Sequence, residues 1–124
     1  MELSENERER LVKKKEEIFK ITSEIINNYE PGENQIEIKD KLNHVLSLLT
    51  TIAGYAEPDR DLNSFTKFVI HLSLNLETPG YDTSLSLQAF CTIANSIKFD
   101  FTKKRFKITI PVKIEAILNK IQFG

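Results

Sequence analysis

Three uncharged stretches occupy the middle of this chain. They span residues 42–56, 68–75 and 83–97, while both ends of the chain are crowded with Lys, Arg and Glu. Exposed apolar faces of that size are uncommon on monomeric proteins, so such stretches form either a core or a surface that a partner covers. They constrain the architecture more than any motif in the sequence does.

A chain of 124 residues fits one domain with one modest core. Its apolar content of 40% and charged content of 28% are ordinary for a globular protein and exclude a disordered chain. We therefore expect a single domain over residues 1–124.

The charged segment 1–30 has the pattern of a long helix. Ser4 followed by Glu7 is typical of a capping box, and the pairs Glu9 with Lys13 and Glu16 with Lys20 have the favourable i, i+4 order. These features predict a helix from about residue 4 to residue 28. The sevenfold spacing of its apolar residues hints at a coiled-coil seam, formed by Leu11, Ile18 and Ile25.

Apolar residues at spacings of three and four predict further helices over residues 36–56 and 83–97. Pro58 ends the first of these, and Asp82 or Thr83 caps the second. Residues 65–76 fit two patterns. A helix uses Phe65, Phe68, Val69, Leu72 and Leu76, and it is the favoured interpretation; a half-buried strand over 66–76 is the alternative, and it would make the fold α+β.

Residues 98–110 change to a period of two, which predicts a basic β-hairpin. Phe99 and Phe101 precede the polar turn, and Phe106, Ile108 and Ile110 follow it. Pro111 ends the second strand, and a short closing helix follows. The expected fold is thus mainly α, a bundle of four to five helices with a short C-terminal hairpin.

No motif in the sequence identifies a reaction. The four glycines are too far apart for a phosphate-binding loop, and His44, His71 and Cys91 lack zinc-ligand spacing. Glu57, Asp59 and Asp61 are expected to cap a helix rather than to bind a cation. We predict no catalytic residue, no cofactor and no metal site, and we expect that the protein is not an enzyme.

The basic turn is the strongest candidate site in the sequence. Lys103, Lys104, Arg105 and Lys107 could neutralise phosphates or meet an acidic partner, with Phe99, Phe101 and Phe106 stacking on bases if they face outward. The alternative is a solvated hairpin whose phenylalanines face the core.

Two functional hypotheses follow. The first is a non-catalytic protein-interaction module of the adaptor, inhibitor, immunity or accessory-subunit type, which binds another protein or a second copy of itself through neutral helix surface. The second is an accessory nucleic-acid-binding protein that uses the basic hairpin without base specificity. The single cysteine and the lack of an apolar run of about 18 residues predict a soluble, cytoplasmic protein without a membrane partner.

Overall fold

The computed structural model describes residues 3–102 and 106–118. Its elements are α1 (Glu5–Asn28), α2 (Gln35–Ala53), α3 (Arg60–Asn75), α4 (Thr83–Ala94), β1 (Lys98–Asp100), β2 (Lys107–Thr109) and α5 (Ile114–Leu118). Four helices pack together in a single, mainly helical domain, and a two-stranded antiparallel hairpin follows them. The expected fold class is therefore confirmed.

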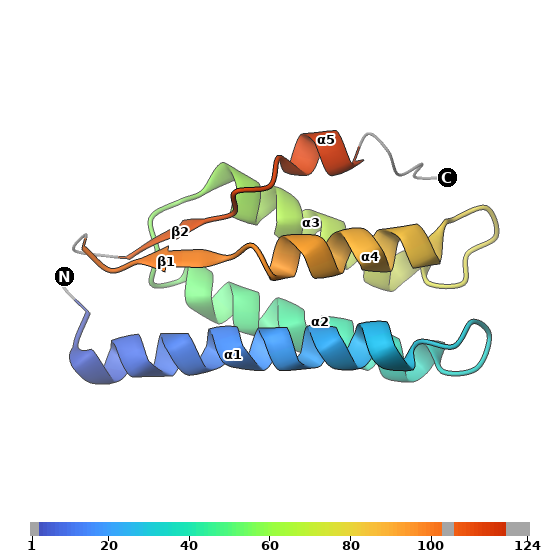
Figure 1. Cartoon of the computed structure of the whole chain (residues 1–124), viewed down its shortest axis with the longest axis horizontal. Helices are drawn as coiled ribbons and strands as arrows, with labels where there is room; N and C mark the ends of the chain where they lie inside the picture. The colour runs from blue at the N-terminus through green and yellow to red at the C-terminus, as the bar shows by residue number, and fades with distance from the viewer. Residues whose placement is uncertain (1–2, 103–105, 119–124) are drawn as a thin grey trace.

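The bundle has two distinct ends (Figure 1). The loop between α1 and α2 and the loop between α3 and α4 lie together at one end, which we call the loop end. The hairpin lies at the opposite end, beside the start of α1, and α5 packs on α3.

The first helix begins at the predicted capping box. The Glu7 N–H donates to Ser4 Oγ at 3.1 Å, and the Ser4 N–H donates to Glu7 Oε1 at 3.0 Å. These bonds satisfy two of the donors that a helix N-terminus leaves unpaired, and the hydrogen bonds with Ser4 lower the pKa of Glu7. The sevenfold row of Leu11, Ile18 and Ile25 is fully buried in the protein's own core, so this row packs within the bundle.

Residues 65–76, which fit both a helix and a strand pattern, belong to helix α3 and its C-terminal cap. Asp59 caps α3, since its Oδ1 accepts a hydrogen bond from the Leu62 N–H at 2.8 Å. The predicted stripe faces inward, and Phe65 stacks on Phe90 of α4 with ring centroids 5.8 Å apart. The strand alternative is therefore wrong, because the helical stripe buries both phenylalanines, whereas an alternating strand would bury only every second residue.

The second and fourth helices end three residues earlier than predicted. α2 stops at Ala53 because the chain turns at Gly54 and Ala56 forms an isolated parallel bridge with Phe106. α4 stops at Ala94, and the next residues lead into β1. After α2 the chain pairs with Phe106 of the hairpin region, whereas after α4 it makes turns that bond back to the helix before β1 begins.

The phenylalanines of the hairpin face inward. Phe106 is fully buried and Phe99 and Phe101 are half-buried, and the three rings lie within 4.9–5.7 Å of one another. Lys15 Nζ lies 5.3 Å from the Phe99 ring centre, and the Arg8 guanidinium lies 5.8 Å from that of Phe101. Two basic side chains from the N-terminal half of α1 therefore contact the aromatic rings of the hairpin.

Candidate functional site

Two of the three neutral stretches are mainly core. The buried residues of 42–56 and 83–97 are Leu42, Val45, Leu48, Leu49, Ile52, Ala56, Thr83, Ser86, Leu87, Phe90, Ile93, Ala94 and Ile97. The protein's own packing therefore accounts for most of their apolar surface. Any surface that a partner covers must be sought among the apolar side chains that stay exposed.

The exposed large apolar side chains concentrate at the loop end. Among the described residues there are seven, and five of them lie in the halves of the helices that border the loops: Ile26, Ile36, Ile70, Leu74 and Leu85. The three most exposed are on neighbouring helices, Ile36 of α2 at 73%, Leu74 of α3 at 67% and Ile70 of α3 at 44%. We call these three residues the α2–α3 patch.

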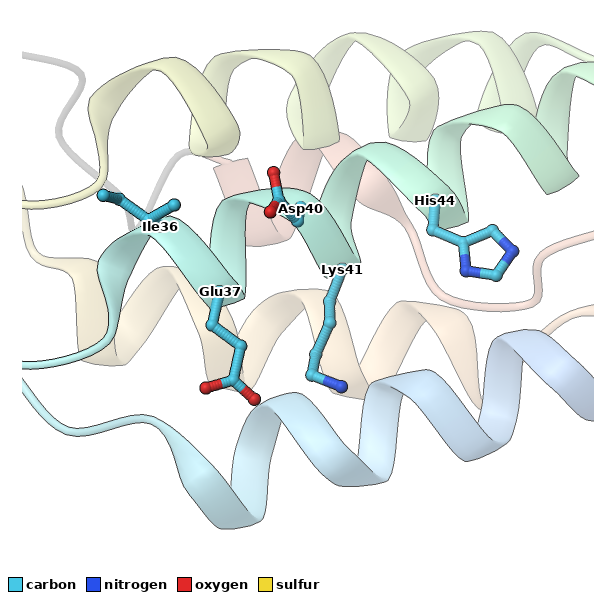
Figure 2. Close-up of a pocket in the computed structure, with 5 residues that line it drawn as sticks. All are labelled: Ile36, Glu37, Asp40, Lys41 and His44. Atoms are coloured by element: carbon cyan, nitrogen blue, oxygen red, sulfur yellow. The ribbon is translucent and has the colours of Figure 1, made fainter.

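The patch follows from how the two helices are placed. Ile70 and Leu74 are four residues apart, so they lie on one face of α3, opposite the face that carries Phe65 into the core. Ile36 is in the first turn of α2, and α3 ends at the same end of the bundle (Figure 1). In Figure 2, Ile36 lies on the edge of α2 beside α3, whereas Glu37 and Lys41 point toward α1. Three exposed aliphatic side chains therefore lie on the outward faces of α2 and α3 near the loop end.

A shallow groove adjoins the patch. It has a volume of about 480 Å³ and is lined by Ile36, Glu37, Asp40, Lys41 and His44, all from α2 (Figure 2). A second groove, of about 220 Å³, lies at the seam of α1 and α4 and includes the exposed Ile26. The first groove adjoins the patch, the second lies between α1 and α4, and a further groove of about 330 Å³ runs along the first half of α1, toward the hairpin end.

Two contacts between side chains of α1 and α2 border the larger groove. Lys41 Nζ lies 2.8 Å from Glu24 Oε2, and His44 Nε2 lies 3.2 Å from Glu17 Oε1. The hydrogen bond that Lys41 donates to Glu24, together with the charge of Lys41, lowers the pKa of Glu24, and the same hydrogen bond raises the pKa of Lys41. These contacts join α1 to α2 beside the groove.

Glu77 holds the two loops of the loop end together. Its Oε1 accepts hydrogen bonds from the Tyr29 hydroxyl at 3.0 Å and from the Gly32 N–H at 3.1 Å. Burial and the bond to Glu77 raise the pKa of Tyr29. Glu77 has a φ of 62°, a conformation that non-glycine residues rarely adopt, and it follows α3 directly after Leu76. Glu77 thus links the loop that follows α3 to the α1–α2 loop.

Sequence reasoning missed the α2–α3 patch. Part of the signal was present, because Ile36, Ile70 and Leu74 fall outside the apolar stripes of their helices; Leu48 and Leu62 were left out of the predicted stripes as well, yet both are buried. An apolar residue off the stripe is expected to be exposed, and a cluster of them across two helices marks a surface.

The basic turn is described only in part. Lys103, Lys104 and Arg105 lie outside the described residues, and Lys107 is an exposed residue of β2 opposite Asp100 of β1. The nearby phenylalanines pack toward α1, as the core-facing alternative predicted, so they are not placed to stack on bases. Nucleic-acid binding by this turn stays a prediction.

The isolated histidines and the cysteine lie in separate places. His44 pairs with Glu17 on the α1–α2 surface, and the His71 ring lies 5.6 Å from that of Tyr81. The sulfur of Cys91 accepts a hydrogen bond from Asn95 Nδ2 at 3.5 Å. Within residues 3–102 and 106–118, no group of three or more His, Cys, Asp or Glu side chains is arranged to hold a metal ion.

In the part of the chain that the structure describes, no helix has both the length and the apolar character to cross a membrane. Comparison of the chain with protein-family models, with curated proteins and with solved structures finds no match.

Proposed function

We propose that this protein is a non-catalytic protein-interaction module that contacts its partner through the α2–α3 patch at the loop end. The observation that carries the proposal is the exposure of Ile36, Ile70 and Leu74 together on neighbouring helices. A single exposed aliphatic residue is normal on a protein surface, whereas a cluster of them beside a groove is typical of an interface.

The placement of the patch on formed helices also supports this proposal. Ile70 and Leu74 are in the interior and last turn of a capped helix, and Glu77 ties the following loop to the α1–α2 loop. A preformed surface binds at a lower entropic cost than one that must order on contact. The patch therefore suits the recognition of a folded or folding partner.

The α2 groove supports a catalytic role less well than it supports a contact surface. His44 and its partner Glu17 have side chains that are 52% and 44% exposed, so water competes with the pair. A general acid or base needs a substrate held within hydrogen-bond reach and shielded from water, and the α2 groove is shallow. The groove residues fit a contact surface better than a reaction centre.

The proposal is tested by quantitative affinity capture from extracts of the cells that produce the protein. Three tagged chains are compared: the natural sequence, the variant Ile36→Gln with Leu74→Gln, and a control variant, Val12→Gln with Tyr55→Gln. The control residues are two exposed apolar side chains, each 39% exposed, that lie toward the hairpin end. Glutamine is a good helix former, so the helices can accept it at positions 12, 36 and 74.

We expect at least one protein to be captured by the natural chain and by the control variant but not by the Ile36→Gln, Leu74→Gln variant. Equal capture by all three chains would show that the patch is not the contact surface. Specific capture of the same chain would mean that the partner is a second copy.

A further inference from the structure

The charge of the loop end limits what its partner can be. Residues 17–44 and 68–88, which make up the loop-end half of the bundle, contain eight acidic and three basic side chains, whereas the whole chain has a net charge of only −1. Six of these acids are exposed: Glu30, Glu33, Glu37, Asp40, Glu77 and Asp82. Lys41 is already paired with Glu24, which leaves Lys20 and Lys39 as the other cations of these ranges. Lys39 is one turn after Ile36, and Lys67, which precedes the second range, is one turn before Ile70; both are exposed, so acids outnumber cations around the patch by less than in the loop-end half as a whole.

A second copy of the chain fits this surface poorly. The patch lies close to the loop end, so a twofold pairing through α3 would bring two loop ends together, each with a net charge of −5. Like charges in such an interface oppose association, and they select against the wrong partner. The complementary partner carries basic side chains around an apolar face.

The shape of the surface favours a helix over a strand. The patch is formed by two adjacent helices, and the side chains of a third helix can pack into the trough between such a pair. The two strands of the hairpin, which could extend a sheet, lie at the other end of the bundle. An amphipathic helix with apolar residues every three or four positions could contact Ile70 and Leu74 on α3 and Ile36 on α2.

From this geometry we infer that the α2–α3 patch binds a basic amphipathic helix of a partner protein, with the apolar face of that helix on Ile36, Ile70 and Leu74. Basic residues along the edge of the helix lie near Asp40 of α2 and near the exposed acids of the two loops, Glu33 and Glu77. This inference rests on the proposed function of the patch and adds the chemistry of the partner.

The test uses two synthetic 18-residue peptides as probes. Both have leucine at the same helical spacing, and their other positions are lysine in one peptide and glutamate in the other. Each peptide is titrated into the full-length protein, and NMR chemical shifts report both the affinity and the residues that respond. We expect the lysine peptide to bind about tenfold more tightly than the glutamate peptide, with the largest shifts around Ile36, Ile70 and Leu74.

Charge-reversal variants make the test specific to this surface. The variant Glu37→Lys with Asp40→Lys removes two acids beside the patch, and the control variant Glu9→Lys with Glu16→Lys makes the same change in net charge on exposed positions of α1. We expect the first variant to weaken binding of the lysine peptide about threefold to tenfold, and the control to change it by less than about twofold.

Equal affinity for the two peptides would overturn the inference, as would shifts centred away from the patch or equal losses in both variants. Such a result would leave the proposed function standing, because affinity capture does not depend on the charge of the partner. Capture of a partner whose contacting segment is acidic or extended would also overturn the inference alone.

Discussion

Phe90 and Leu74 are both large apolar residues in helices, but only one of them stabilises the fold. Phe90 is fully buried and stacks on Phe65, whereas Leu74 is 67% exposed. Removing a buried side chain costs its transfer free energy and leaves a cavity, while truncating an exposed one costs little. The contrast separates residues that hold the bundle together from residues that are available to a partner.

We therefore predict opposite outcomes for two alanine variants. Phe90→Ala should lower the free energy of unfolding by about 3–5 kcal/mol, and Leu74→Ala should change it by no more than about 0.5 kcal/mol. Urea denaturation followed by circular dichroism measures both values. A large loss for Leu74→Ala would mean that this residue belongs to the core and would remove it from the patch.

The ion pair between Glu24 and Lys41 predicts a dependence on pH. The folded-state pKa of Glu24 is lowered by Lys41, so the pair stabilises the protein above the ordinary carboxyl pKa and loses this contribution as the pH falls through the folded-state value. The pKa of Lys41 is raised in the folded protein, so its pH dependence runs the other way: the stabilisation by Lys41 is present at lower pH and is lost as the pH rises through its folded-state pKa in the alkaline range.

We expect Glu24→Gln to lower the melting temperature slightly at neutral pH, with a difference from the natural protein that disappears under acidic conditions. Thermal melts across the acidic range measure this difference. Because both partners are solvated, the effect should also shrink at high salt. If the difference in melting temperature stayed constant down to low pH, the Glu24→Gln substitution would be acting through something other than the loss of the ion pair with Lys41.

At the scale of the element, local chemistry predicted where helices begin better than where they end. Ser4, Asp59 and Asp82 were each expected as possible caps, and each accepts a backbone hydrogen bond at the start of its helix. Capping depends on a few neighbouring residues, so the sequence alone reveals it. The end of α2 depends on the hairpin, which lies about 50 residues away from Ala53, and no local pattern near α2 carries that information.

The cap of α3 is open to a direct test because this element had two interpretations. Asp59→Ala should destabilise the protein by about 1 kcal/mol, since the Leu62 N–H loses its acceptor, whereas Asp59→Asn should keep most of the stability because asparagine also caps helices. Chemical denaturation compares the two variants. Equal losses in both would assign the effect to the charge of Asp59 rather than to its hydrogen bond.

At the scale of the whole molecule, apolar surface and charge are distributed unevenly between the two ends. The sequence predicted the neutral stretches, and the fold shows that most of their apolar side chains are internal. Which apolar residues remain exposed depends on how four helices are rotated against one another, and this rotation is a property of the assembled bundle. The sequence therefore predicted the helices of this surface, while the grouping of Ile36, Ile70 and Leu74 required the structure.

The most direct test of the proposed function is site-specific photo-cross-linking in living cells. A benzophenone amino acid replaces Leu74 in one chain and Glu16, an exposed residue of α1, in a control chain. We predict that irradiation links the chain to a partner protein from position 74 and not from position 16. The absence of an adduct from position 74, or the same adducts from both positions, would contradict a binding surface at the loop end.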